Sequence, residues 1–254
     1  MIIQNETEQA ALIEGGRRLA VVLRTLCDKV APGVSSEELD DLAEQMILEG
    51  GDEPVFLGYT PEGAGRPYPA TLCVSINDDV VHGIPNEMPK TLKDGDIVGL
   101  DLGLRHEGIV VDAARTVPVG KIDAKTVKLL SATEAALAAG IAAAIPGNHV
   151  GDISQAIQKE IEAAGFTVIR ELGGHGVGDR VHEEPFIPNF GKPGSGELLE
   201  EGMVLALEPI SSAGKAAVTL APDGYTFRTK DGSRSAHFEH TILLQKGGAR
   251  IITG

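Results

Sequence analysis

The sequence of 254 residues predicts a single α+β domain, with helices outside a curved antiparallel sheet. Three observations support this fold class. Helical patterns near the start give way to strand patterns up to about residue 120, and the same order recurs in the second half. The two halves also resemble each other in sequence. Finally, no low-complexity linker interrupts the chain, so residues 1–254 are expected to form one unit.

The first two helices are predicted from apolar spacing and capping residues. Residues 6–28 place leucine, valine and alanine side chains at helical spacing, which gives one broad apolar face. A second helix begins near Ser35, because Ser35 and Glu38 have the spacing of a capping box, and Gly50-Gly51 marks its end. The remaining predicted elements are two helices, at roughly 123–145 and 152–164, and strand-rich stretches at about 53–120 and 166–246.

An internal duplication divides the chain into halves of about residues 1–122 and 123–254. Pro32-Gly33 recurs as Pro146-Gly147, and Gly51 recurs as Gly165, each 114 positions later. Two such α+β halves would form a cleft between them, which is a natural place for a site. The apolar residues that recur at the same offset, with helical spacing, are Leu39, Ala43 and Ile47, followed by Ile153, Ile157 and Ile161.

The composition argues against some classes of partner and indicates a soluble, cytoplasmic protein. With 22 Lys and Arg against 37 Asp and Glu, the net charge is −15, so no broad basic face for nucleic acid or an anionic membrane is expected. Cys27 and Cys73 are too isolated for a disulfide framework, which favours a reducing compartment. The N-terminus lacks the pattern of a secretory signal. The longest nearly apolar run, residues 135–145, is shorter than the about 20 residues that span a bilayer.

Two aspartates are predicted to lie close together in a β-hairpin over residues 97–120. Apolar residues alternate around Asp101, so its side chain points to the opposite face of the strand from theirs. A turn centred on His106-Glu107 would place Asp101 directly across from Asp112, although other turn types shift this pairing by about one position. Two carboxylates this close repel each other unless a proton or a cation lies between them. The alternative is that both aspartates are exposed strand residues.

Two glutamates lie beside or within strands that the pattern predicts to be buried. Glu208 follows the apolar run MVLAL, and Glu239 precedes the strand-forming run TILL. A buried glutamate must be paired, protonated or bound to a metal, and a structural salt bridge would explain either one alone. No matching set of lysines or arginines occurs in apolar strands, however. Two divalent metal ions would neutralise these glutamates and the two aspartates, with an imidazole expected among the ligands.

The stretch GHGVGDRVHEEP, residues 174–185, contains His175 and His182 in a glycine-rich run. The glycines disfavour a helix, because each costs about 1 kcal/mol relative to alanine. On one straight strand the odd separation would send the two side chains to opposite faces. The rings therefore converge only if the chain bends between them, and Gly178-Asp179 permits a bend. The local sequence leaves open whether both histidines bind the same ligand.

Five motifs, in order, resemble those of the methionine aminopeptidases. They are TLCVSIND…VHGIP, DLG…VVD, GHGVG…HEEP, MVLALEP and SAHFEHT. The resemblance extends from the first helix to the last strand and is closest to the short bacterial type I form. It implies the pita-bread fold, in which duplicated α/β halves surround a curved antiparallel sheet. It also implies a metal-dependent aminopeptidase that removes the N-terminal methionine when the second residue is small.

The resemblance further implies a dinuclear metal site, with two divalent ions of Co, Mn, Fe or Zn. In this family Asp112 and Glu239 would bridge the ions, Asp101 would bind one of them, and His175 with Glu208 would complete the other. A water between the two ions would have a lowered pKa and would attack the first peptide bond. Glu208 would then carry a proton from this water to the leaving amine.

The family also implies residues that contact the substrate. His182 would donate a hydrogen bond to the carbonyl oxygen of the scissile bond, and His82 would contact the amide nitrogen or the next residue. Cys73, Tyr68 and Tyr225 match or lie near positions that line the pocket for the first side chain.

Some positions depart from the family pattern. Val110-Val111 precede Asp112 where polar or glycine residues are common, bacterial relatives often have tryptophan at the place of Tyr225, and the loop at Gly58–Pro67 is unlike the commonest version. The pocket outline therefore follows the family less closely than the metal ligands do. Two further histidines, His237 and His240, flank Glu239 and are predicted to point away from it.

Two other functions are compatible with a similar ligand set. Xaa-Pro aminopeptidases and prolidases share the fold but usually carry an additional N-terminal domain. A catalytically silent pita-bread protein would bind peptides without metal and would be expected to lose ligands, whereas all five are present here. We expect a monomer that acts on N-terminal peptides or nascent proteins near the ribosome, without binding nucleic acid or membranes.

Overall fold

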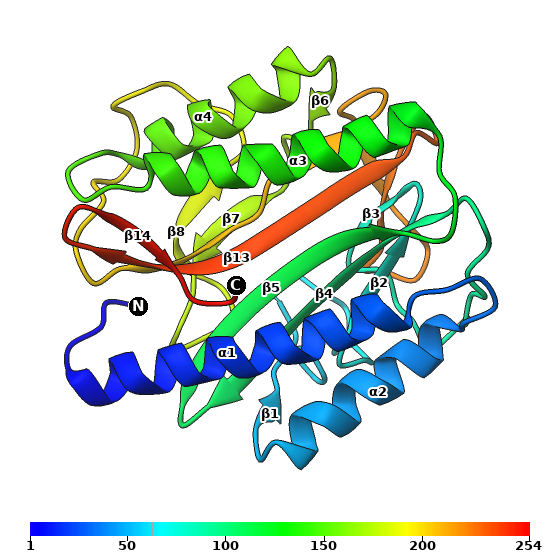
Figure 1. The fold of residues 1–254 in the computed structure, drawn as a ribbon, viewed down its shortest axis with the longest axis horizontal. Coiled ribbons are helices and arrows are strands. Elements are labelled where there is room, and N and C mark those ends of the chain that lie inside the picture. Colours follow the sequence, from blue (N-terminus) through cyan, green and yellow to red (C-terminus); the bar gives the residue numbers. More distant parts are fainter. Residues whose placement is uncertain (62) are drawn as a thin grey trace.

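The computed structural model describes residues 1–61 and 63–254. Its four α-helices are α1 (Glu6–Lys29), α2 (Ser36–Glu49), α3 (Ala124–Ala143) and α4 (Val150–Ala163), counted over the described residues. Each lies within a few residues of its predicted range. One helix pair precedes each group of strands, which confirms the predicted order of elements (Figure 1).

The ends of the first two helices are fixed by side-chain caps. The Asn5 side chain accepts a hydrogen bond from the Glu8 backbone N–H at 3.0 Å and so begins α1. The predicted capping box at α2 is present, because the Glu38 carboxylate accepts from the Ser35 N–H at 2.9 Å while Ser35 caps the first turn. Gly50 then ends α2, as predicted.

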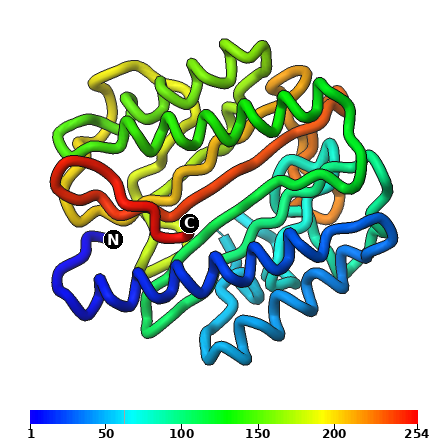
Figure 2. Tube along the Cα trace, viewed as in Figure 1, coloured from blue at the N-terminus to red at the C-terminus, as the bar shows by residue number. Residues whose placement is uncertain are grey.

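The second half repeats the geometry of the first at the offset seen in the sequence. Both ends of α4 lie 114 positions after the corresponding ends of α2. The turns before these helices match too, because Gly33 has a φ of 98° and Gly147 a φ of 97°. In Figure 2, α1 and α3 run in opposite directions on either side of the central strands, as a twofold relation between the halves requires.

The two turn glycines give a test of this equivalence. Gly33→Ala and Gly147→Ala are each expected to lower the free energy of unfolding by about 1–2 kcal/mol, because a left-handed φ disfavours a Cβ. Apart from their chain neighbours, no described residue has an atom within 4 Å of either added Cβ, so conformational strain is the main cost. Urea denaturation measures both effects. The control is Gly65→Ala, with open space but no left-handed φ, which is expected to be neutral or slightly stabilising. Unequal effects at Gly33 and Gly147 would contradict the equivalence of the turns.

The main sheet is antiparallel and holds eleven strands among the described residues, with the backbone order β1-β4-β5-β13-β9-β7-β8. A smaller sheet has the order β11-β12-β3. Strand β13 lies at the centre, paired with β5 from the first half and β9 from the second. The strands are β1 (Glu53–Pro54), β2 (Cys73–Ile76), β3 (Asp79–Val81), β4 (Ile97–His106), β5 (Ile109–Pro118), β6 (Thr167–Val168), β7 (Gly173–Gly176), β8 (Glu183–Pro188), β9 (Val204–Leu207), β10 (Ile210–Ser212), β11 (Val218–Leu220), β12 (Phe227–Thr229), β13 (Ser235–Gln245) and β14 (Gly248–Ile251).

The helices pack against the sheet and form two apolar cores. Helix α1 contacts β4 and β5, and its buried leucines belong to the first core. Helix α3 contacts α4 and β13 and contributes Leu129 and Leu137 to the second. Of the helices that the structure describes, α3 alone is long and apolar enough to cross a membrane, and it packs on α4 and β13.

The hairpin β4–β5 is present, but its predicted register is wrong. The turn residues are Glu107 and Gly108, both with positive φ, so the hairpin turns one position later than expected. Asp101 therefore pairs with Ala114, while Asp112 pairs with Gly103. Because this shift moves each partner by two residues, both aspartates still point to the same face and are diagonal neighbours.

Candidate metal centre and active site

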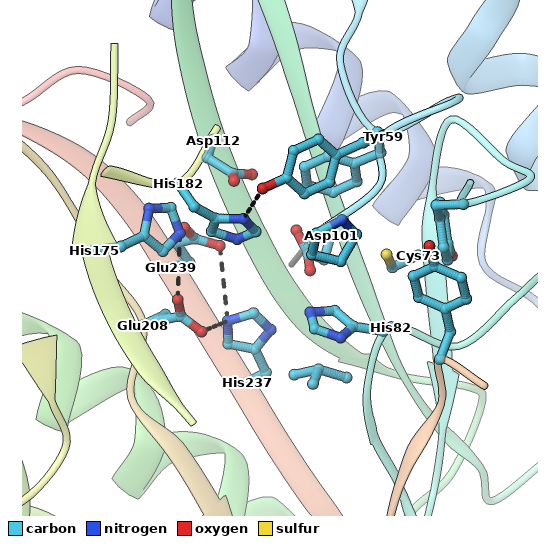
Figure 3. A pocket seen from close by; sticks show the side chains of 15 residues that line it. Tyr59, Cys73, His82, Asp101, Asp112, His175, His182, Glu208, His237 and Glu239 are labelled. Carbon is cyan, nitrogen blue, oxygen red and sulfur yellow. Dashed lines mark hydrogen bonds and ion pairs between the residues drawn. The ribbon is translucent and has the colours of Figure 1, made fainter. Parts of the chain in front are cut away.

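All ten residues predicted for the site line one cavity (Figure 3). The metal-ligand candidates lie at one end and the proposed first-side-chain pocket at the other. The sequence prediction did not include five further lining residues. The complete lining is Phe56, Tyr59, Pro61, Tyr68, Cys73, Val81, His82, Asp101, Asp112, His175, His182, Glu208, Tyr225, His237 and Glu239.

Five neighbouring strands each bring one candidate ligand to the cavity. In spatial order, β4 carries Asp101, β5 carries Asp112, β13 carries Glu239, Glu208 follows directly after β9, and β7 carries His175. The sheet therefore assembles residues that are far apart in the sequence. Because these residues belong to consecutive strands, the register of the sheet decides their spacing.

The glycine-rich run forms the hairpin β7–β8, and at two of its glycines there is no room for a side chain. A Cβ at Gly174 would lie 2.3 Å from the backbone oxygen of Ala206, and one at Gly176 would lie 2.2 Å from that of Glu184. The bend predicted at Gly178 is present, with a φ of 138°. It brings the rings of His175 and His182 together, with centroids 4.5 Å apart.

The cavity contains several buried carboxylates whose oxygen atoms have few hydrogen-bond partners among the described residues. The Oδ1 atoms of Asp101 and Asp112 and the Oε1 atom of Glu239 are buried and have no hydrogen-bond partner in the part of the chain that the structure describes. Burial, and then the neighbouring Asp112, raise the pKa of Asp101 well above its usual range. Burial also raises the pKa of Glu239 and Glu208, and the surrounding carboxylates raise it further. The described residues that line the cavity include no lysine or arginine, so these groups stay ionised together only if cations are bound.

The cavity histidines are suited to bind metal rather than to pair as cations. Burial lowers the pKa of His175 to about 3 and that of His82 to about 4, so both rings are neutral at physiological pH. The Nδ1 atom of His175 lies 3.0 Å from the backbone oxygen of Gly176, to which it donates. This bond places the lone pair of His175 on Nε2, which is 3.5 Å from Glu208.

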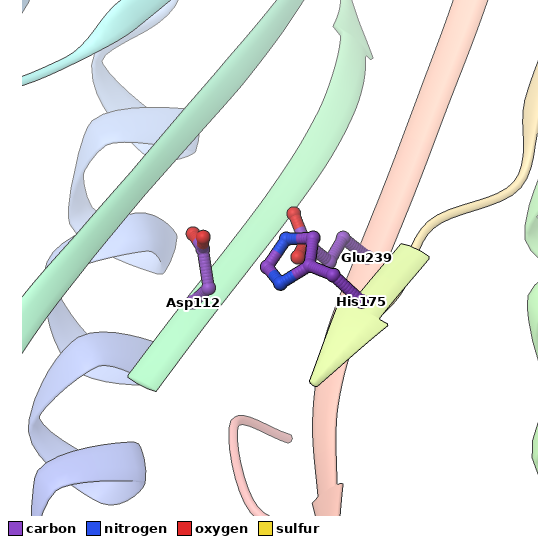
Figure 4. A group of neighbouring side chains, drawn as sticks. All are labelled: Asp112, His175 and Glu239. Carbon is purple, nitrogen blue, oxygen red and sulfur yellow. The ribbon is translucent and has the colours of Figure 1, made fainter. Parts of the chain in front are cut away.

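One subset of these ligands already has the spacing of a metal site. Single ligand atoms of Asp112, His175 and Glu239 lie within 4.8 Å of one another, and all three residues are buried (Figure 4). Carboxylate oxygens and an imidazole nitrogen together suit divalent ions such as Mn, Fe, Co and Zn. The unpartnered oxygens and this ligand set fit bound divalent metal.

His237 was wrongly predicted to point away from Glu239. The two residues are two positions apart on β13, so their side chains share a face, and His237 Nε2 lies 3.7 Å from Glu239 and 3.6 Å from Glu208. His240 does point to the other face, where its Nδ1 lies 3.0 Å from the hydroxyl of Thr253. The period-two rule applied to SAHFEHT would have identified His237.

The far end of the cavity is formed by a buried, largely apolar cluster. Tyr68 and Tyr225 pack edge to face, with ring centroids 5.1 Å apart, and form a buried cluster with Cys73. The Tyr68 hydroxyl donates to the backbone oxygen of Gly83 at 2.9 Å. His82 lines the same cavity and has a left-handed φ of 58°, a conformation that non-glycine residues adopt mainly where surrounding structure requires it.

A comparison of the sequence with models of protein families shows which family the chain belongs to. The model of a family described as metallopeptidase family M24 matches residues 10–246, which include every candidate ligand. The chain belongs to metallopeptidase family M24. Family M24 membership makes it a hydrolase that depends on divalent metal ions, in agreement with the partner-poor carboxylates of the cavity.

Two methionine aminopeptidases are similar to this chain over nearly their full length. The chain is 43% identical to a methionine aminopeptidase of Clostridium perfringens, covering 100% of this chain and 98% of that protein. It is 42% identical to methionine aminopeptidase 1 of Bacillus subtilis, covering 100% of this chain and 99% of the relative. The resemblance drawn from the five motifs is thereby confirmed.

Solved structures of family M24 confirm the pita-bread fold. A methionine aminopeptidase from Thermotoga maritima superposes with a TM-score of 0.94 at 41% identity, covering 100% of this chain and 99% of that one. A prolidase from Pyrococcus furiosus superposes with a TM-score of 0.74 at 21% identity, and this chain covers 65% of its length. At that identity the prolidase shows the shared fold alone.

Asp112 is buried at the centre of this M24 site. We therefore expect the stability of the metal-free protein to depend on pH. Burial raises the pKa of Asp112 from 3.8 to about 7. Between about pH 4 and 7 the folded state therefore holds a proton that the unfolded chain releases, so this group lowers stability as the pH rises. Asp112→Asn removes the penalty and should gain stability relative to the parent protein across this window, by about 4 kcal/mol at most.

Urea denaturation in the presence of chelator, at about pH 4 and about pH 7, measures this difference. Glu197→Gln, which changes an exposed carboxylate outside the cavity, controls for the loss of one negative charge. A difference between Asp112→Asn and the parent protein that stays constant with pH would contradict the buried-carboxyl explanation.

Proposed function

We propose that the protein is a methionine aminopeptidase, which removes the N-terminal methionine from peptides and nascent proteins when the second residue is small. The observation that carries this function is the single cavity that joins a five-residue carboxylate and imidazole cluster to an apolar pocket. Full-length relatives with that name support the choice. The cluster provides the hydrolytic end, and the pocket provides the specificity.

The five clustered residues would hold two divalent ions. By family resemblance, Asp112 and Glu239 would bridge the ions, Asp101 would bind one, and His175 with Glu208 would complete the other. When bound, the ions would neutralise the carboxylates and lower the pKa of a water molecule towards neutral pH. Mn, Fe, Co and Zn all suit these ligands.

The remaining residues would bind the substrate and move protons. The cluster of Tyr68, Cys73 and Tyr225 would hold the methionine side chain in an apolar environment. His182, at the mouth, would donate a hydrogen bond to the carbonyl oxygen as negative charge develops on it. Glu208, whose pKa is raised by burial and then by the neighbouring carboxylates, would carry the proton to the leaving amine.

A peptide assay tests the function against its rivals. Met-Ala, Met-Lys and Ala-Pro peptides are incubated with Mn²⁺, Co²⁺, Fe²⁺ or Zn²⁺, with and without chelator. Cleavage of Met-Ala alone, abolished by chelator and restored by metal, is the expected result. Cleavage of Ala-Pro would favour an Xaa-Pro aminopeptidase. No cleavage with any metal would favour a peptide-binding protein without activity.

We further propose a cytoplasmic monomer that works near the ribosome, where newly made N-termini emerge. The net charge of −15 supports an enzyme without a broad nucleic-acid-binding face. The two thiols, Cys27 and Cys73, are both free, as a reducing compartment favours. Light scattering of the purified protein tests the monomer, and ribosome co-sedimentation tests the location.

A further inference from the structure

The catalytic candidate His182 has a hydrogen-bond partner that the sequence did not predict. Its Nδ1 atom lies 2.8 Å from the hydroxyl oxygen of Tyr59 (Figure 3). Tyr59 comes from the segment between β1 and β2, in the first half of the chain, whereas His182 directly precedes β8 in the second. The bond therefore joins the two halves across the mouth of the cavity.

The backbone beside Tyr59 is held by its own contacts. The Gly58 N–H donates to the carbonyl oxygen of Tyr68 at 2.9 Å, and the Tyr68 N–H donates to that of Tyr59 at 2.8 Å. Further along the same segment, the carbonyl oxygen of Arg66 accepts from the Tyr225 hydroxyl at 2.5 Å. The backbone at Gly58 and Tyr59 is thus hydrogen-bonded to that of Tyr68.

The chemistry of the two groups decides which one donates. A neutral imidazole has one N–H and one lone pair, and its partners determine which nitrogen carries the hydrogen. A phenol stays protonated at neutral pH and donates well, while the imidazole lone pair is the better acceptor. This chemistry favours donation from the Tyr59 hydroxyl to Nδ1 of His182. With that direction, the hydrogen of His182 lies on Nε2, on the far side of the ring from Tyr59.

His175 provides the opposite case within the same hairpin. Its Nδ1 donates to the backbone oxygen of Gly176, so its lone pair lies on Nε2. Both rings lie in one cavity and touch edge to face. The backbone acceptor leaves His175 with a lone pair on Nε2 that can bind a metal. The tyrosine donor leaves His182 with an N–H on Nε2 that can donate a hydrogen bond.

We propose that Tyr59 is a positioning residue that keeps His182 in the tautomer with hydrogen on Nε2, ready to donate to the carbonyl oxygen of the substrate. The substrate part of this inference rests on the proposed function. The tautomer is a property of the protein before substrate or metal binds, and it is measured separately.

Nitrogen NMR of the metal-free protein, labelled with ¹⁵N in its histidines, tests the tautomer. Nδ1 of His182 should have the chemical shift of a lone-pair nitrogen and Nε2 that of an N–H nitrogen, with the reverse in His175. Tyr59→Phe should mix the two forms of His182 and leave His175 unchanged. The control Tyr68→Phe removes a hydroxyl that donates to Gly83 instead, and should leave the His182 signals unchanged. An N–H signal from Nδ1 of His182, or no response to Tyr59→Phe, would overturn the proposal.

Kinetics with a Met-Ala peptide test the catalytic consequence. Tyr59→Phe should lower kcat by about 3- to 10-fold, the effect of one hydrogen bond, with little change in KM. In a His182→Ala background the same change should have no further effect, because Tyr59 acts through that ring. An equal loss in both backgrounds would contradict the proposal. If no variant, including the parent protein, cleaves the peptide, the proposed function fails while the NMR result still decides the tautomer.

Discussion

Replacing His175 by alanine is expected to weaken divalent-metal binding by more than about 100-fold, beyond the loss usual for residues that only support a ligand. Its Nε2 lone pair faces Glu208, and the remaining candidates are all carboxylates that repel one another. Turnover should fall with metal occupancy and recover in part at high metal concentration. Calorimetric titration of the metal-free protein with Mn²⁺ measures the affinity.

The matched control for this variant is His240→Ala. His240 lies on β13 beside Glu239 but faces the opposite side of the sheet, next to Thr253. It should bind Mn²⁺ with the affinity of the parent protein. If His175→Ala also kept full affinity, the proposed ligand set would be wrong.

His182→Ala is expected to retain metal and lose activity, with kcat falling by about 10²- to 10³-fold. The His182 ring lies at the mouth of the cavity and is hydrogen-bonded to Tyr59. It is not needed to complete the buried cluster of Asp112, His175 and Glu239. The variant would therefore bind Mn²⁺ normally but lack the donor to the developing oxyanion. Steady-state kinetics with saturating metal, together with the same titration, provide the check.

The two histidine variants together test a division of roles within one hairpin. Loss of metal in both to the same extent would show that His182 is also a ligand. Normal turnover in His182→Ala would remove it from the reaction. Because the residues are only seven positions apart and their rings touch, a general distortion of the hairpin would affect both properties in both variants.

The sequence predicted the helices well and singled out the metal-site candidates, because each signal is local. The capping box at Ser35 and the stop at Gly50 depend only on neighbouring residues. Acidic residues beside apolar strands, such as Glu208 and Glu239, are unusual enough to be noticed without knowing the partner strands. The five ordered motifs then supplied the roles that local patterns left open.

The sequence predicted contacts between distant segments less well. The pairing of Asp101 depended on one turn position, and Glu107-Gly108 has less of a turn signature than Asn-Gly would have. The partner of His182 could not be predicted, because Tyr59 is brought to it by a loop whose shape depends on Tyr68 and Tyr225. The orientation of His237 was mispredicted, although the alternation of side chains along a strand would have given it correctly.

The central position of β13 has a consequence for how the enzyme becomes active during synthesis. Among the described strands, β13 is the one that connects the ladder β1-β4-β5 to the ladder β9-β7-β8. Until residues 235–245 have left the ribosome, the strand of Asp112 and the strand of His175 belong to separate sheets. Pairing across so long a stretch of chain is slow, because loop closure must precede the contacts that stabilise it. A partly made copy is therefore expected to be inactive until β13 pairs with both ladders.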